Sequence, residues 1–385
     1  MKPLLYFILC ILVSTSCSKN THKSGSQDTR SEAKRIDSLF QDFDHLETPG
    51  YAVGVSVNDR IIYSAGFGAA NLDYNLPITP QSAFSIASVS KQFTAAGIAL
   101  LILDDKLSLE TPVSTFIPEL NKYPDTIRVK HLLYNTSGIK DYPHLSRKDE
   151  KSWVTFNYFD VDECIAVSLA ETTLQFKPGE RWDYCNVNFM LLTKIIEKIS
   201  GTSFSDYMTT EIFDPLEMTH TLINDDITTV IPNRVTPYNY RNPEILEGYK
   251  SYGLTLKADG DFIQHPRNSP HYGGSGVVTT MDDLMKWSMN MATGTFGGDE
   301  FYDLMHTTLT FNHDRNNQAF GLYIGDFNGR EIVAWDGGDW GISSQLMRFP
   351  KDKVSIAVLS NIGTGEAFRK VNAIAEILIE EGIIK

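Results

Sequence analysis

The stretch that decides the fold is FSIASVSKQFTAAGIALLIL, residues 84–103. Ser88 and Lys91 stand three residues apart at the start of a run that we expect to be helical, so their side chains lie on one face within reach of each other. A serine hydroxyl becomes a good nucleophile when a neighbouring base takes its proton, and a lysine amine can be that base if burial lowers its pKa. The turns that follow are apolar on every side, which predicts a central, buried helix.

The Ser-x-x-Lys spacing is weak on its own, because it also occurs at Ser16 and Lys19, in a segment outside the folded domain. The placement of Ser88 at the start of a buried helix favours the hypothesis that Ser88 is a nucleophile. Free backbone amides and the dipole at that helix start would also favour negative charge developing near Ser88. Further motifs must decide whether the spacing at Ser88 marks a catalytic pair or is a chance match.

Composition is that of an ordinary globular protein. The chain has 385 residues, 42% of them hydrophobic and 21% charged, which suffices for one large domain or two modest ones. The formal charge of −14 argues against nucleic acid or an anionic membrane surface as a partner. No Cys-x-x-Cys and no clustered His, Cys and carboxylate spacing occurs, so we expect neither a metal site nor a cofactor.

Residues 1–17 differ from all that follows. A lysine, an apolar run and a small-residue segment ending at Cys17 have the order of a secretory signal that is too short to span a bilayer. The end of the segment resembles a bacterial lipoprotein cleavage site, although Ser14 stands where such signals usually carry leucine. We therefore expect an exported, periplasmic or cell-envelope protein attached to the membrane through a lipidated Cys17, with simple secretion as the alternative. Residues 18–30 are polar and suit a flexible linker.

Two cysteines, Cys164 and Cys185, remain in the body of the chain. In an oxidising compartment they could form one disulfide, but two cysteines in a chain of this length are no disulfide framework. Small buried thiols are the favoured interpretation.

The folded domain, residues 31–385, has strand signals at both ends and helical signals between them. Alternating residues predict a hairpin over 51–57 and 60–67, and an antiparallel pair over 341–349 and 354–359. A closing helix carries a stripe formed by Phe368, Val371, Ala375 and Leu378. Apolar residues also recur at helical spacing over 36–43. Between the strand regions we expect a mainly helical insertion over about 107–265, which contains a long helix at 189–199 closed by Gly201.

Together these signals predict an α+β fold. One antiparallel sheet, built from the N- and C-terminal parts of the chain, is flanked by helices, and the mainly helical insertion covers one side of the site.

A second chemical motif is Tyr184-x-Asn186, which comes just before the long helix. A tyrosine near a lysine ammonium can have its pKa lowered and pass protons, and the asparagine offers both a donor and an acceptor. The same kind of spacing occurs at 240–242 and 288–290. Tyr184 is preferred because it lies on a turn ahead of a packed helix, where a side chain can point into a cleft.

Taken together, these motifs resemble the serine β-lactamase and penicillin-binding-protein superfamily, specifically the class C-like branch that includes D-alanyl-D-alanine carboxypeptidases, esterases and D-aminopeptidases. The resemblance covers the chain from about residue 31 to its end, and residues 131–139, 212–218 and 273–284 look like segments of that branch in the same order. It implies a β-lactamase/transpeptidase-like fold and an acyl-enzyme mechanism. Ser88 would attack, Lys91 and Tyr184 would shuttle the proton, and Asn186 would orient the substrate; which of Lys91 and Tyr184 is the first base stays open.

The third motif of that family, Lys-Thr-Gly or His-x-Gly, is altered here. The matching place reads Trp335-Asp336-Gly337-Gly338, so tryptophan replaces the usual cation. The letters His271-Tyr272-Gly273 also fit, but they precede a helix instead of the last strands, and we discount them. We assign Trp335, Asp336, Gly337 and Gly338 to substrate binding, with the amides of Gly338 and Ser88 able to form an oxyanion hole.

The loss of the cation predicts poor recognition of substrate carboxylates, since charge-assisted hydrogen bonds to them are no longer available. The sequence therefore predicts an exported serine hydrolase that acts through acyl-Ser88 on a small-molecule or peptide substrate with an ester or amide bond. The alternatives are a catalytically degenerate protein that binds peptidoglycan or a partner, and a β-lactamase or D-alanyl-D-alanine carboxypeptidase. The oligomeric state is left open.

Overall fold

The computed structural model describes residues 31–145, 158–251, 253–257, 259–265, 269–310, 317–363 and 366–385. The expected signal and linker, residues 1–30, lie outside these ranges. Within them, no helix combines the length and the apolar character needed to cross a membrane.

A six-stranded antiparallel sheet forms the centre of the molecule, in the order β10-β11-β12-β13-β1-β2. Its strands are β1 (Tyr51–Val57), β2 (Arg60–Phe67), β10 (Tyr323–Phe327), β11 (Arg330–Asp339), β12 (Ile342–Phe349) and β13 (Val354–Ser360). The hairpin and the C-terminal strand pair predicted from the sequence are confirmed, and β1 pairs with β13. The two ends of the chain therefore build one sheet.

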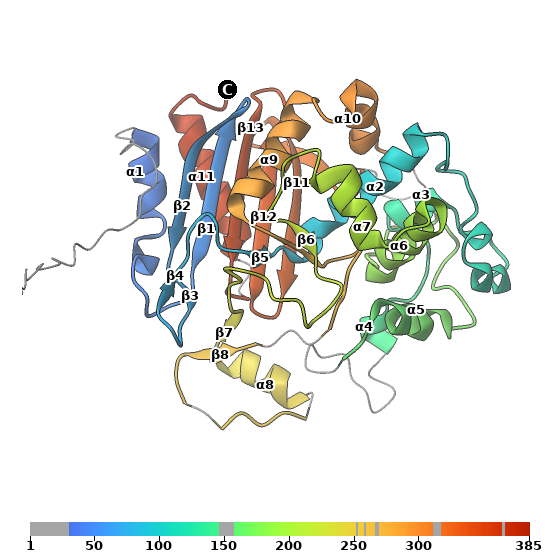
Figure 1. Cartoon of the computed structure of the whole chain (residues 1–385), viewed down its shortest axis with the longest axis horizontal. Coiled ribbons are helices and arrows are strands. Elements are labelled where there is room, and N and C mark those ends of the chain that lie inside the picture. The colour runs from blue at the N-terminus through green and yellow to red at the C-terminus, as the bar shows by residue number, and fades with distance from the viewer. Residues whose placement is uncertain are drawn as a thin grey trace, which may run out of the picture.

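Both faces of the sheet are covered, because successive residues of β1 belong to different cores. Val53 and Val55 pack with helix α11 (Glu366–Glu380), and α1 (Ser31–Ser38) packs on α11. Ala52 faces the core shared with α9 (Met281–Thr293). Figure 1 shows α1 beside the strands at one edge and α9 crossing the sheet.

The nucleophile helix lies on the α9 side of the sheet. Helix α2 (Lys91–Leu103) follows a 3₁₀ turn, Ala87–Ser90, and all of its residues from Lys91 to Ala99 are buried. The predicted central helix is therefore confirmed. It packs against α6 (Asn186–Ser200) and α10 (Gly298–His306).

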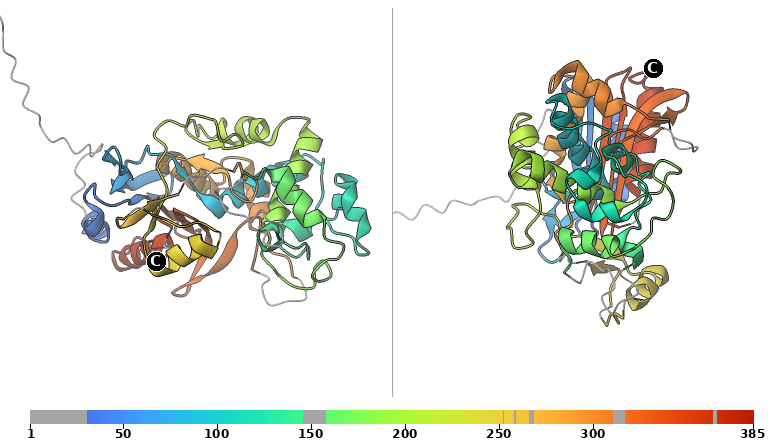
Figure 2. Two further views of the ribbon diagram at one scale, coloured as in Figure 1. Left: turned by 90° about the horizontal axis from the view of Figure 1, so that it is seen from below. Right: turned by 90° about the vertical axis from the view of Figure 1, so that its right-hand side faces the viewer.

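Helices are the most frequent regular elements of the region from 107 to 265, which also contains three short strands that the sequence did not predict. The long helix α6 ends as predicted at Gly201, whose φ is 74°. Figures 1 and 2 both place α3 to α7 at the end of the sheet away from α1. Other elements of this region are the 3₁₀ turns 113–115 and 118–122, α3 (Val129–Leu133), α4 (Tyr142–Leu145), α5 (Val161–Leu169), α7 (Phe204–Met208), a π turn at 209–213, β6 (Leu222–Ile223), β7 (Tyr238–Tyr240), α8 (Pro243–Ser251) and β8 (Phe262–Gln264).

The short strands mostly pair with one another. β5 (Phe84–Ser85), β9 (Val277–Thr279) and β6 form a small sheet directly before the nucleophile turn, while β7 and β8 form a ribbon beside α8. The remaining elements are a 3₁₀ turn at 41–43, β3 (Ala69–Asn71) and β4 (Leu76–Pro77).

The α+β class with an antiparallel sheet is confirmed, but two details were wrong. Phe368, placed on the buried stripe of the closing helix, is 52% exposed, whereas Val371, Ala375 and Leu378 are buried. Helical spacing over 36–43 corresponds to α1 followed by a separate 3₁₀ turn. Both errors arise because a sequence pattern does not show where a packed helix ends or which residue lies at the edge of its buried face.

Candidate active site

Ser88 lies in the 3₁₀ turn that opens α2 and is partly exposed. The residue before it, Ala87, has a φ of 44°, a conformation that side chains other than glycine rarely adopt. Neighbouring strands hold this turn: Ser344 Oγ donates to Ile86 O over 2.7 Å, and Ser90 Oγ accepts from Val277 N over 3.1 Å. The backbone that presents Ser88 is therefore fixed from two sides.

Lys91 is completely buried, and its amine is surrounded by acceptors. Nζ lies 3.1 Å from Ser88 Oγ, 3.0 Å from Asn186 Oδ1 and 2.7 Å from Gly274 O. A neutral amine has two hydrogens and one lone pair. It can donate to Asn186 and Gly274 while the lone pair receives the proton of Ser88.

Burial lowers the pKa of Lys91 to about 7, against the opposing effects of the nearby Asp141, Cys185 and Asp336. A substantial fraction of the amine is therefore neutral near pH 7. The requirement set by the sequence, that burial make the lysine a usable base, is met by this geometry.

Tyr184 lies on the other side of the nucleophile, with its hydroxyl 2.6 Å from Ser88 Oγ. Lys91 Nζ is 4.7 Å from the centre of its ring. The expectation that the lysine lowers the pKa of Tyr184 was wrong. Burial raises the pKa of this phenol well above its usual value, an effect that the hydrogen bond with Ser88 only partly offsets. Tyr184 therefore keeps its proton near neutral pH and can donate it in the hydrogen bond with Ser88 Oγ.

Asn186 is the first residue of α6, and its amide is held from behind by a residue that the sequence reading missed. Its Nδ2 donates to Asp141 Oδ2 over 2.9 Å, so Oδ1 is turned toward Lys91. Asp141 is 5% exposed and also accepts from Val187 N over 3.1 Å. The only signal in the sequence was its position two residues after the segment 131–139.

The segment 131–139 supports the turn that carries Tyr184. Asn135, which has a φ of 53°, accepts at its backbone oxygen from Asp183 N over 2.9 Å. Its side-chain Oδ1 accepts from Cys185 N over 3.3 Å and from Asn188 Nδ2 over 3.1 Å. This explains physically why the segment accompanies the Tyr184 motif in the sequence.

The glycine-rich segment 273–276 brings backbone oxygens to α2. Gly273 O accepts from Thr94 Oγ1 and Gly274 O from Lys91 Nζ, both over 2.7 Å. A Cβ added at Gly274 would lie 3.3 Å from Lys91 Nζ. The segment therefore needs a small residue where it contacts the lysine.

The strand β11 forms the opposite wall. It carries Trp335, whose ring lies at 25° to that of Tyr184 with 6.5 Å between the centroids. Gly337 is pressed against the nucleophile turn, because a Cβ there would lie 2.4 Å from Ile86 O and 2.9 Å from Ser88 N. Gly338 follows it and faces the cleft.

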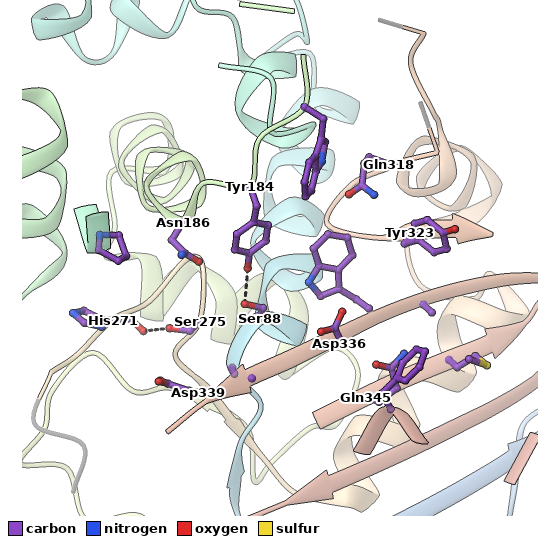
Figure 3. A pocket seen from close by; sticks show the side chains of 18 of the residues that line it. Ser88, Tyr184, Asn186, His271, Ser275, Gln318, Tyr323, Asp336, Asp339 and Gln345 are labelled. Atoms are coloured by element: carbon purple, nitrogen blue, oxygen red, sulfur yellow. Dashed lines mark hydrogen bonds between the residues drawn. The ribbon is translucent and has the colours of Figure 1, made fainter. Parts of the chain in front are cut away.

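A cleft of about 580 Å³ opens above Ser88. Figure 3 shows Tyr184 and Asn186 on one side of Ser88 and Asp336 on the other. Ser88, Tyr184, Asn186, Trp335, Asp336 and Gly338 line the cleft, while Lys91 lies buried behind Ser88. The structure thus brings together the residues proposed from the sequence, around Ser88.

His271 also lines this cleft, on the side of Asn186 and Ser275 (Figure 3). It does not occupy the third-motif position, because β11 carries Trp335 there. Its ring lies 5.6 Å from that of Tyr142, and its backbone oxygen accepts from Ser275 Oγ. The sequence reading discounted His271 as a motif and so missed it as a wall of the cleft.

Cys164 and Cys185 are buried free thiols, as the favoured interpretation had them. Burial raises the pKa of both, and Cys185 Sγ lies 3.7 Å from Asp141 Oδ1. Within the described ranges, no group of three or more His, Cys, Asp or Glu side chains could hold a metal ion.

Comparison with characterised sequences gives distant relatives. The chain is 27% identical over 314 residues to a D-aminopeptidase of Gluconobacter oxydans, covering 81% of this chain and 56% of that protein. It is 27% identical over 352 residues to penicillin-binding protein 4* of Bacillus subtilis, covering 86% of this chain and 72% of the relative. The chain thus spans little more than half the length of the D-aminopeptidase.

Solved structures with the same fold include an octameric penicillin-binding-protein homologue from Pyrococcus abyssi, with a TM-score of 0.74, 24% identity and coverage of 92% of this chain and 78% of that one. A D-amino acid amidase from Ochrobactrum anthropi also has a TM-score of 0.74, at 19% identity, covering 91% of this chain and 99% of the amidase. The Beta-lactamase family model matches residues 36–381. This match extends over nearly the whole described domain, so the protein belongs to the beta-lactamase family.

Proposed function

We propose that this protein is a serine hydrolase that cleaves an amide or ester bond through an acyl-Ser88 intermediate. The observation that carries the proposal is the pair of contacts at Ser88 Oγ, with Lys91 Nζ at 3.1 Å and the Tyr184 hydroxyl at 2.6 Å. A serine held between a partly neutral amine and a protonated phenol has both a proton acceptor and a proton donor at hand.

In the acylation step, neutral Lys91 takes the proton of Ser88 while Oγ forms a bond to the substrate carbonyl carbon. The carbonyl oxygen gains the negative charge. The bond to the leaving amine or alcohol then breaks, and this group takes the proton of Tyr184. The Tyr184 phenolate recovers a proton from the Lys91 ammonium beside its ring, so that Lys91 is neutral again. Water hydrolyses the acyl-Ser88 ester by the reverse sequence of proton transfers.

We assign the oxyanion hole to the backbone amides of Ser88 and Gly338. Gly337 supports this assignment, because its lack of a side chain lets β11 approach the Ser88 amide closely. The N-terminus of α2 also carries the positive end of the helix dipole, which stabilises negative charge on the carbonyl oxygen. Such donors stabilise charge that develops only during the reaction.

The preferred substrates are neutral or cationic acyl donors. Trp335 offers an aromatic face where a carboxylate-binding cation would stand, and Asp336 beside it adds negative charge. The curated relatives named as a D-aminopeptidase and a penicillin-binding protein are consistent with an amide or peptide substrate. A β-lactamase or carboxypeptidase activity is disfavoured by the missing cation. A purely binding role is disfavoured by the complete set of contacts around Lys91.

A fluorophosphonate probe tests the nucleophile. It should label the wild-type protein and fail on Ser88→Ala, while Lys91→Ala should abolish steady hydrolysis of a nitrophenyl ester. The matched variant Ser85→Ala, two residues before the nucleophile turn, should retain labelling. Labelling that persists in Ser88→Ala would exclude Ser88 as the nucleophile.

We further propose that the protein is exported and anchored through a lipidated Cys17, on the strength of the N-terminal sequence alone. Full-length protein expressed in a bacterial host should incorporate labelled fatty acid and partition into detergent. Cys17→Ala should lose both properties. Export without acylation would instead support the secreted alternative.

A further inference from the structure

Asp336 and Gln345 stand side by side at the wall of the cleft formed by β11 and β12. They are direct cross-strand partners in the sheet, and both line the cleft. In Figure 3, Asp336 lies between Ser88 and Gln345. The position of this pair places a carboxylate and an amide next to each other, close to the nucleophile.

The Asp336 carboxylate and the amide oxygen of Gln345 have no hydrogen-bond partner in the described part of the chain. Asp336 is exposed and has no hydrogen bond or ion pair with any described residue. Gln345 is only 3% exposed, yet its Oε1 has no hydrogen-bond partner in the described part of the chain. A buried amide oxygen without a partner costs free energy, and a ligand that donates a hydrogen bond to it would remove that cost.

The charge of the cleft has one sign. Its described lining includes the carboxylates of Asp336 and Asp339 and contains neither lysine nor arginine. The charge of Asp336 also reaches the reaction centre, since it raises the pKa of both Lys91 and Tyr184. A cation bound at Asp336 would therefore lie near the acyl group that Ser88 attacks.

The surroundings of the pair are apolar. Ala334 and Met347 form the next cross-strand pair on the same face, and both line the cleft. Phe368 of α11 also lines it and is 52% exposed, which is unusual for so large an apolar ring. An acidic group bordered by apolar side chains suits a ligand with a charged head on a hydrocarbon stem.

We propose that Asp336 and Gln345 form a subsite that binds a protonated primary amine of the substrate, with Ala334, Met347 and Phe368 contacting the hydrocarbon that carries it. The amine donates to the Asp336 carboxylate and to the amide of Gln345. This assignment rests on the proposed hydrolase function, and it names the chemical class of acyl donor that the site selects. A metal cation fits less well, because the described residues offer no group of three ligands here.

Two matched substrate pairs test the subsite. One is phenylalanine nitroanilide against its N-acetyl derivative, with the amine next to the scissile carbonyl. The other is 6-aminohexanoyl nitroanilide against hexanoyl nitroanilide, with the amine at the end of a chain. The wild-type protein should favour the free amine in at least one pair, as a ratio of kcat/KM, and the favoured pair locates the amine.

Asp336→Asn should reduce that ratio roughly tenfold, because a charge-assisted hydrogen bond at a partly solvated site is lost. Gln345→Leu should reduce it by a smaller factor. Glu331→Gln is the matched control, since Glu331 is an exposed carboxylate on the same strand outside the cleft. That control should keep the full preference. High salt should weaken the preference of the wild-type protein as well.

The outcomes separate this inference from the proposed function. If the probe labels Ser88 but neither pair shows a preference for the amine, the amine subsite is wrong and the hydrolase stands. A preference that survives in Asp336→Asn likewise overturns the subsite. Failure of the probe and of every substrate would instead contradict the hydrolase itself. Equal thermal unfolding of the two carboxylate variants would show that a lost preference is not a loss of folding.

Discussion

The hydroxyl of Tyr184 lies 2.6 Å from Ser88 Oγ. Burial keeps this phenol protonated at neutral pH, so it is available as a hydrogen-bond donor to the nucleophile. Lys91, whose pKa is lowered to about 7, is then the group able to receive the serine proton. The sequence left open whether Lys91 or Tyr184 first takes the proton of Ser88. Because the pKa of Lys91 is the lower of the two, we propose that Lys91 is the first base.

This assignment predicts the pH dependence of hydrolysis. Because the base must be neutral, kcat/KM for a neutral nitrophenyl ester should fall about tenfold per pH unit below an apparent pKa near 7. The profile is measured after correction for spontaneous hydrolysis, with circular dichroism to confirm folding at each pH. A profile that stays flat down to pH 5 would show that Lys91 does not act as the base.

The same buried amine should destabilise the fold. The pKa of Lys91 is about 7 in the folded state against an ordinary 10.5, so between these values the unfolded chain holds the extra proton and stability rises with pH. Below pH 7 the penalty is complete. Lys91→Met removes this penalty. The stability of the variant relative to wild type should therefore be greater at pH 6 than at pH 9 by roughly 2–3 kcal/mol.

Denaturant unfolding at the two pH values measures this difference. The pH-independent cost of the acceptors left by Lys91→Met cancels in the comparison. Lys351→Met, at an exposed turn, is the matched control and should show no such pH dependence. An equal effect of both variants would contradict the buried-amine explanation.

Asp141 should act as a positioning residue for Asn186. In Asp141→Asn the charge that raises the pKa of Lys91 is gone, so the acidic limb of the kcat/KM profile should move to lower pH. The weaker hold on the Asn186 amide should also lower kcat roughly tenfold. The pH profile separates this role from general destabilisation, because a merely structural defect would lower the rate without shifting the limb.

Gly337 should tolerate no side chain. In Gly337→Ala the new Cβ would meet Ile86 O and Ser344 Oγ at 2.4 Å, which forces β11 away from the Ser88 amide. If that amide belongs to the oxyanion hole, kcat should fall by about 10²–10³. Gly338→Ala, where the Cβ meets open space, should lose far less, as steady-state kinetics of the two variants would reveal.

Trp335 should govern discrimination against carboxylates. Trp335→His restores a cationizable side chain opposite Tyr184 and should raise the turnover of nitrocefin relative to a neutral nitrophenyl ester. Trp335→Phe keeps an aromatic ring without that charge and serves as the control. Rapid nitrocefin turnover by the wild-type protein would show that tryptophan does not exclude such substrates.

The sequence predicted the parts of the fold that local patterns encode. The period-two alternation of residues 51–57 identified β1, because its valines face α11 while small residues face α9. Gly54 illustrates the second half of this pattern, since a Cβ there would lie 2.6 Å from Met281 Sδ. The long strand β11 was recognised only as a motif site, because its second half faces the cleft and lacks a regular apolar pattern.

At the site, spacing identified Ser88 with Lys91 and Tyr184 with Asn186, pairs that lie close together along the chain. Asp141 and His271 were missed because their positions depend on how distant segments pack. The pKa of Tyr184 was wrongly anticipated for a related reason: the charge of a nearby lysine was visible in the sequence, but the burial that outweighs it was not.

The pairing of β1 with β13 has a consequence for how the protein matures. The nucleophile helix α2 is synthesised well before β11, which flanks the nucleophile, and before β13, which pairs with β1, because the whole region 107–265 lies between them. During synthesis, the nascent chain therefore carries Ser88 long before β11 is anchored between β10 and β12. We expect such a chain to be inert toward acyl donors until β11, β12 and β13 have joined the sheet. Because these strands pair with residues far away in the sequence, folding should also be slow.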